Sequence, residues 1–142
     1  MPLMNLLKTE FRIWNPQKNK METLLLQGKP VADAFQSELE ARINDLSKKD
    51  IIPQLAAIIV GDDPASQIYV RNKTRLFKKM NCKSQTFQLP EDAYDNEVEE
   101  LIDNLNNDVE IHGILVQLPL PKHLDSRKIL HSVNPGKDVD GF

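Results

Sequence analysis

The sequence predicts an α/β domain of three layers, in which helices cover both faces of a mostly parallel sheet. Two short apolar runs and one weakly alternating segment are interspersed along the chain with segments whose apolar residues recur every three or four positions. Proline and glycine bound these runs and limit each of them to the length of a buried strand. Because strands that alternate with helices are joined by right-handed crossovers, this order favours a parallel sheet.

The first helix is expected over residues 30–47, where Pro30 suits the first helical turn. Residues 54–60 then form an apolar run between Pro53 and Gly61, which is typical of a strand buried on both faces. The helix expected over residues 30–47 has apolar residues at helical spacing, which are Val31, Phe35, Leu39, Ile43 and Leu46.

The second half of the chain repeats this alternation. Residues 83–89 alternate weakly in polarity and end at Pro90, which predicts a strand, and residues 111–117 predict another. Asp125 is a suitable N-cap for a short helix that follows the third strand. The apolar stripe of the helix between the two strands consists of Val98, Leu101, Ile102 and Leu105.

A polar helix follows the first strand directly, with Asp63 as its N-cap and Pro64 as its first residue. Ser66, Tyr69 and Lys73 are spaced by three and four positions and therefore share one face of this helix. From its spacing alone, the lysine is better explained as part of a solvated basic face than as a catalytic group. The other basic residues of the helix are Arg71, Arg75, Lys78 and Lys79.

Composition narrows the classes of function. The chain of 142 residues is 40% hydrophobic and 27% charged, which fits one globular domain. A net charge of −3 gives no electrostatic footprint for nucleic acid or an anionic membrane. The single cysteine, Cys82, favours a reducing compartment, so the cytoplasm is the expected location. The three histidines show no metal-ligand spacing, and no metal site is expected.

Polar residues lie where two predicted strands end. Ligands of open parallel sheets bind outside the carboxyl ends of the strands, so residues 61–73 and Gln117 are expected to meet in one cleft. Alternatives remain open for each residue alone: Gln117 could cap a strand end, and Asp138 and Asp140 could stabilise a loop.

Three segments together carry a specific resemblance. VGDDPASQIYVRNK, HGILVQLPLPKH and NPGKDVDGF occur in this order and closely resemble the catalytic domain of the bifunctional methylenetetrahydrofolate dehydrogenase / methenyltetrahydrofolate cyclohydrolase family. The resemblance covers residues 21–142, which are expected to form the catalytic domain. Residues 1–20 are expected to be a disordered extension, or an artefact of the assigned start, with Met21 as the natural first residue.

The resemblance implies an enzyme of folate one-carbon metabolism. Such an enzyme oxidises 5,10-methylenetetrahydrofolate with NADP and hydrolyses the methenyl product to 10-formyltetrahydrofolate. The family motifs place the catalytic residues on Lys73, Tyr69 and Gln117 and the substrate-binding residues on Tyr69, Ser66, Gln117, Pro119 and Asp140, with Val139 along the same wall as Pro119.

These residue types suit the chemistry that the resemblance implies. A lysine amine at Lys73 that can give up its proton could take one from the attacking water and return it to the departing ring nitrogen. Gln117 has both a donor and an acceptor with which to orient the amine and the water. Tyr69 offers a flat face for stacking, and Asp140 can accept two hydrogen bonds from a pterin.

The chain departs from the family pattern in one respect. It contains no Gly-x-Gly-x-x-Gly fingerprint, and Gly61 is followed by aspartates that would repel a phosphate. The NADP site, and the interface of the family homodimer, are therefore expected on a second, Rossmann-type domain that this chain lacks.

Three readings follow from this departure. The chain is either the catalytic half of a longer enzyme or a remnant that binds folate or a partner without turnover. A generic flavodoxin-like or receiver domain is the third, in which Asp62 and Asp63 would bind a metal and the Gln117 and Asp140 motifs would be coincidental.

Overall fold

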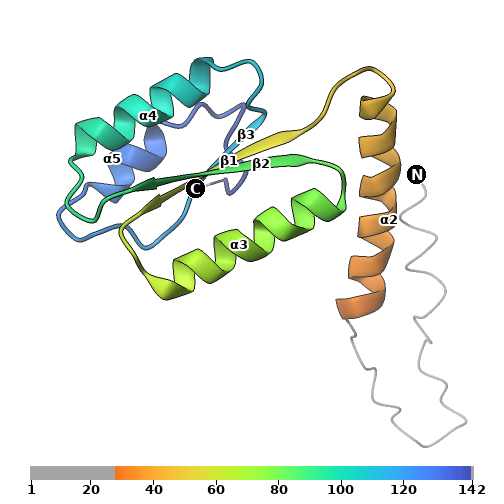
Figure 1. Ribbon diagram of the computed structural model, residues 1–142, viewed down its shortest axis with the longest axis horizontal. Coiled ribbons are helices and arrows are strands. Elements are labelled where there is room, and N and C mark those ends of the chain that lie inside the picture. The colour runs from red at the N-terminus through yellow and green to blue at the C-terminus, as the bar shows by residue number, and fades with distance from the viewer. Residues whose placement is uncertain (1–27, 142) are drawn as a thin grey trace, which may run out of the picture. The chain divides into compact units, whose positions relative to one another are not determined.

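Residues 28–141 are described by a computed structural model, in which helices and strands alternate as the sequence predicts (Figure 1). Both longer strands have the predicted bounds, and the third is shorter than predicted. It begins only at Gly113 because the Ile111 N–H closes a turn onto Asp108 O (3.2 Å). The elements are α2 (Gly28–Ser47), β1 (Gln54–Val60), α3 (Pro64–Lys79), β2 (Lys83–Leu89), α4 (Asp95–Asn107), β3 (Gly113–Val116) and α5 (Ser126–His131).

The three strands form a parallel sheet in the order β2-β1-β3. β1 lies in the middle and pairs with β2 along its whole length, from Gln54↔Lys83 to Val60↔Leu89. Its six residues after Gln54 are buried, as expected for a central strand covered on both faces. The predicted parallel sheet is therefore confirmed.

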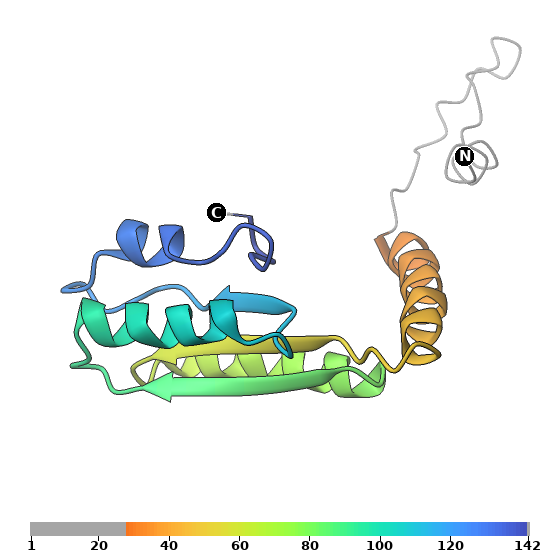
Figure 2. The ribbon, with the colours of Figure 1, turned by 90° about the horizontal axis from the view of Figure 1, so that it is seen from above.

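Helices cover both faces of this sheet, and alternate residues of β1 point to each of them (Figure 2). On one face Ala56, Ile58 and Val60 join a large apolar cluster with residues of α4 and α5. On the other face Leu55, Ala57 and Ile59 pack with Val70 of α3 and Leu115 of β3. This arrangement confirms the predicted three-layer α/β/α architecture.

Two compact units divide the chain, residues 1–34 and residues 35–142, and the layered domain lies within the second. α2 crosses the boundary. Its helical conformation confirms the prediction for residues 30–47, but none of its side chains is buried. Val31, Phe35 and Leu39 of its apolar stripe are about half exposed. The expectations for residues 1–20 lie outside the described residues.

The predicted helix caps are both present. Asp63 accepts a hydrogen bond from the Ser66 N–H at 2.7 Å, and Pro64 begins α3. Asp125 caps α5 by accepting from the Lys128 N–H at 3.0 Å. Among the described residues, no helix combines the length and the apolar character that crossing a membrane requires.

Candidate active site

A pocket of about 320 Å³ lies between α3 and the carboxyl end of β3. Four residues predicted from the sequence meet in it although they are distant along the chain. Parallel strands place such residues together because their carboxyl ends meet at one edge of the sheet. The lining residues are Tyr69, Lys73, Val116, Gln117, Leu118 and Asp140.

α3 contributes the phenol and the amine. Val70 is buried against the sheet, so its neighbours Tyr69 and Lys73 lie on the flank of the helix that lines the pocket. Tyr69 is 63% exposed, which leaves a ring face open to a ligand. Lys73 is half-buried, and its ammonium makes no hydrogen bond or ion pair with any other residue of the range 28–141.

β3 delivers Gln117 to the pocket. The Gln117 N–H donates to Ile58 O at 2.9 Å, which extends the β1–β3 ladder by one residue and fixes the backbone. The side-chain Nε2 donates to Leu118 O at 2.7 Å. The side-chain Oε1 is buried and has no partner among the described residues. A buried acceptor without a donor is costly, so this oxygen favours a ligand or side-chain donor in the pocket.

Asp140 reaches the pocket on a segment that runs alongside β3. The Ile114 N–H donates to Lys137 O at 2.7 Å, and Ile114 and Asp138 form a parallel bridge. Asp138 Oδ1 then accepts from the N–H groups of Asp140 and Gly141, each at 3.0 Å. Asp138 therefore stabilises the loop, as one alternative proposed, whereas the Asp140 carboxylate has no partner within residues 28–141.

Two residues that position this segment were missed from the sequence. Lys137 Nζ donates to Leu105 O (2.9 Å) and Asp108 O (2.6 Å), the carbonyl groups at the end of α4. Gly113 leaves room for the segment, because a Cβ there would lie 2.6 Å from Val139 Cγ1. A glycine inside a strand does signal a close backbone approach, but nothing in the sequence distinguished Lys137 from other lysines.

The remaining predicted site residues lie near the pocket but do not line it. Ser66 is buried in the first turn of α3. Pro119 is exposed and follows Leu118 through a cis peptide bond. Val139 packs over Gly113. Contact of these three residues with a substrate stays a prediction.

A metal ion and a phosphate group need different partners among the described residues. No group of three or more potential ligands (His, Cys, Asp or Glu) lies close enough together in that range to hold a metal ion. The N-terminus of α3, where a phosphate would bind, is already capped by Asp63. Asp62 beside it accepts a hydrogen bond from Gln88 at 2.8 Å, so two carboxylates lie at this helix start and would repel a phosphate.

The sequence model of the tetrahydrofolate dehydrogenase/cyclohydrolase catalytic domain matches residues 26–140 of this chain. The chain belongs to this family. All six residues that line the pocket fall within the matched range. The bifunctional protein FolD of Streptococcus pyogenes serotype M5 (strain Manfredo) is 51% identical over 121 residues, which cover 84% of this chain and 43% of the relative.

Solved structures of the family have the same fold. The FolD methylenetetrahydrofolate dehydrogenase/cyclohydrolase of Campylobacter jejuni superimposes with a TM-score of 0.80 at 44% identity, covering 83% of this chain and 42% of that one. The FolD enzyme of Trypanosoma brucei, solved with NADP cofactor and inhibitor, gives 0.77 at 33% identity, with 85% and 41% covered. The chain thus spans less than half the length of these relatives.

Proposed function

We propose that this chain forms the folate-binding, proton-transferring half of a bifunctional methylenetetrahydrofolate dehydrogenase/cyclohydrolase. The observation that carries the proposal is the pocket in which Lys73 and the Gln117 side chain, both without partners for their reactive atoms among residues 28–141, meet Tyr69 and Asp140. Family membership supplies the substrate class, a reduced folate.

The hydrolytic step fits the residues present. Water adds to the methenyl carbon, a carbon–oxygen bond forms, and the bond from that carbon to one ring nitrogen breaks to leave the 10-formyl product. Lys73 takes one proton from the attacking water and passes it to the departing nitrogen, and the second proton of the water is released to solvent as the formyl C=O forms. Gln117 Oε1, buried beside the pocket, accepts a hydrogen bond from the Lys73 amine or the water and orients it.

Tyr69 and Asp140 hold the folate. The exposed ring of Tyr69 stacks on the pterin, where an offset arrangement of flat rings is favourable. The Asp140 carboxylate accepts hydrogen bonds from the pterin amino and ring N–H groups, and no described residue competes for it. Lys73 lines the same pocket as the stacking ring and the glutamine.

The oxidation step requires NADP in addition to the folate. One solved relative is known in complex with NADP, and in this chain the start of α3 is capped by the Asp63 carboxylate, which would repel a phosphate. We propose that neither NADP binding nor the homodimer interface expected for the family involves the start of α3. We place the protein in the cytoplasm, because its one cysteine fits a reducing compartment.

The hydrolytic step can be tested on this chain alone, because hydrolysis needs no dinucleotide. The chain is mixed with 5,10-methenyltetrahydrofolate, and the loss of its absorbance is followed after subtraction of uncatalysed hydrolysis. We expect saturable turnover that Lys73→Met abolishes. Lys79→Met is the matched control, since Lys79 ends the same helix but does not line the pocket.

Binding is measured in parallel by titration with tetrahydrofolate, with Tyr69→Ala as the variant. Saturable binding that Tyr69→Ala weakens, without turnover, would support the alternative of a folate-binding remnant. Turnover that Lys73→Met leaves unchanged would reject Lys73 as the acid and base. Absence of both binding and turnover would reject a folate site in this chain.

A further inference from the structure

The side chain of Asn106 joins the end of α4 to the segment that leads to Asp140. Its Nδ2 donates to Ser132 O at 2.8 Å, and its Oδ1 accepts from the Asn134 N–H at 2.9 Å. Asn106 is half-buried and does not line the pocket. Because an amide offers both a donor and an acceptor, this one side chain holds the distant backbone at two points.

Further hydrogen bonds connect this anchored backbone with Asp140. Asn134 O accepts from the N–H groups of Lys137 (2.8 Å) and Asp138 (3.0 Å). The Asp138 carboxylate accepts in turn from the Asp140 N–H at 3.0 Å. The position of the Asp140 backbone therefore depends, through two short turns, on the backbone that Asn106 holds.

Lys137 provides a second attachment to the same helix end. Its Nζ donates to Leu105 O and Asp108 O, the carbonyl groups on either side of Asn106 in the sequence. The last carbonyl groups of a helix have no partner within it, so a cation beside them is favourable. The end of α4 thus holds the segment both by a side chain and by its own backbone.

The other polar residues of the pocket are held by different elements. Tyr69 and Lys73 belong to α3, and the Gln117 N–H donates to Ile58 O of β1 at 2.9 Å. A change at Asn106 should therefore displace Asp140 and leave the groups of the proposed proton transfer in place.

We propose that Asn106 is a positioning residue for Asp140, which it places for folate binding from the end of α4 without touching the folate. This inference rests on the proposed function, because it takes a reduced folate as the ligand of Asp140. It adds a residue outside the pocket that sets the affinity for substrate but not the rate of its hydrolysis.

Steady-state hydrolysis of 5,10-methenyltetrahydrofolate separates positioning from a loss of folded protein. Asn106→Ala should raise KM about fivefold and leave kcat nearly unchanged, because Asp140 binds substrate whereas Lys73 moves the proton. A partly unfolded variant would instead lower kcat and keep KM. Asn107→Ala is the matched control, since the Asn107 amide bonds only to Asp103 of its own helix within the described residues.

A double-mutant cycle tests whether Asn106 acts through Asp140. Titration with tetrahydrofolate should show that Asn106→Ala weakens binding about fivefold in the unaltered chain and has nearly no effect once Asp140→Ala is present. Equal losses in both backgrounds would overturn the inference, because the effect of Asn106 would then not pass through Asp140.

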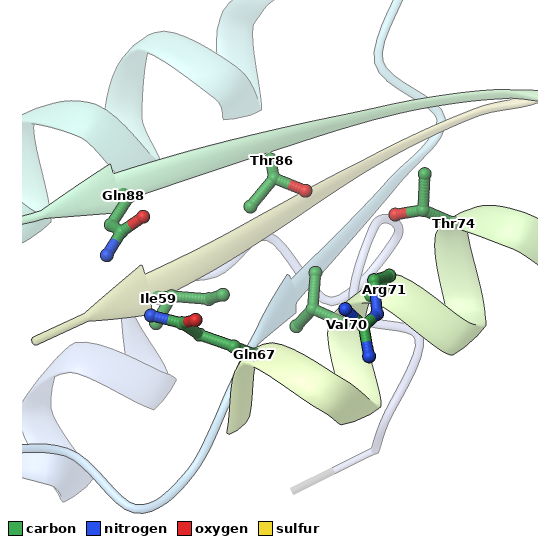
Figure 3. Close-up of a pocket in the computed structure, with 7 residues that line it drawn as sticks. All are labelled: Ile59, Gln67, Val70, Arg71, Thr74, Thr86 and Gln88. Carbon is green, nitrogen blue, oxygen red and sulfur yellow. The ribbon is translucent and has the colours of Figure 1, made fainter. Parts of the chain in front are cut away.

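A further control checks where the folate binds. Figure 3 shows a second cavity, of about 290 Å³, on the flank of α3 away from Lys73. Among the described residues that line it, Arg71 alone is charged, and an arginine suits the anionic glutamate tail of a folate. Arg71→Ala should leave folate affinity unchanged. Binding that depends on Arg71 and not on Asp140 would overturn the inference.

Hydrogen exchange of the unaltered chain gives a test that needs no variant. Coupling between two sites is reciprocal, so tetrahydrofolate should raise the protection of the Asn134 amide, which donates to Asn106. The Asp125 amide, which donates to Asp95 at the other end of α4 (2.9 Å), should not change. Folate binding that leaves the Asn134 amide unchanged would overturn this inference and leave the proposed function standing. Absence of folate binding by the unaltered chain would overturn both.

Discussion

Asp138 and Asp140 lie two positions apart in one loop and have opposite surroundings. The Asp138 carboxylate is occupied by two backbone N–H groups, so it contributes to the shape of the loop. The Asp140 carboxylate has no partner within residues 28–141 and lines the pocket. A carboxylate without an internal partner near a pocket is available to a ligand, so the two aspartates should respond differently to replacement.

Asp140→Ala should weaken tetrahydrofolate binding at least about tenfold, since a charge-assisted hydrogen bond contributes about 1.5–3 kcal/mol. The free energy of unfolding should stay nearly constant, because the Asp140 side chain is exposed. Asp138→Ala is the comparison and should lower the stability of the loop as well as affinity. Folate titration and urea unfolding measure both quantities. Equal folate affinity for Asp140→Ala and the unaltered chain would exclude the proposed contact.

Gly113 is a second residue whose replacement is informative, because it should change stability although the residue does not line the pocket. A Cβ at this position would lie 2.6 Å from Val139 Cγ1, so Gly113→Ala must displace the segment that carries Asp140. We expect a loss of about 1–3 kcal/mol in unfolding free energy, as for other overpacked sites. Gly28→Ala is the control, because nothing lies within 4 Å of a Cβ there. Urea unfolding that shows equal stability for both variants would contradict this account.

Among the elements, α3 depends on its first turn. The Ser66 N–H donates to the Asp63 carboxylate and holds the pKa of that carboxyl below its usual value of 3.8. Because the pKa in the folded chain is the lower one, the ionised cap stabilises the fold above the pKa of the unfolded chain. This contribution is lost as the pH falls through the folded pKa.

The pH dependence of thermal unfolding measures this effect. From neutral pH to below about pH 4, the unaltered chain should lose stability as Asp63 becomes protonated. Asp63→Asn still offers an acceptor but carries no charge, so the midpoint temperature should depend less on pH. Asp92→Asn is the control, since Asp92 makes no hydrogen bond within the described range. Equal pH slopes for the Asp63 and Asp92 variants would count against the cap.

The elements also show how far the sequence alone predicts this protein. β1, β2 and the start of α3 were predictable because proline, glycine and a capping aspartate mark their ends locally. The late start of β3 was not predicted, because a turn from Asp108 to Ile111 uses the Ile111 N–H. The exposure of the α2 stripe was not predictable either, because burial depends on contacts with distant segments. The residues of the site also fall into those placed by local spacing and those placed by distant contacts. Helical spacing places Tyr69 beside Lys73, but Asp140 joins them only through the pairing of its segment with Ile114.

Across the whole molecule, the two faces of the sheet are unequally packed. α4 buries Val98, Ile102 and Leu105 in the large cluster, whereas Val70 is the only apolar residue of α3 that is fully buried. Burial of apolar side chains is the main contribution to local stability, so the α3 layer is the less firmly held of the two. The proposed acid and base, Lys73, stands on that layer.

Native-state hydrogen exchange should show this inequality directly. Helical amides in the middle of α3 should exchange through an opening of lower free energy than those of α4 or β1, because fewer buried contacts must break.

A folate bound among Tyr69, Lys73 and Asp140 would join α3 to the 137–141 segment and selectively raise the protection of α3. Ile102→Ala, in the large cluster, should lower global stability by about 2–5 kcal/mol and leave the local opening of α3 nearly unchanged. If α3 and β1 exchanged with the same free energy in the absence of ligand, the sheet and both helical layers would open as one unit, and the proposed weakness of the α3 layer would be wrong.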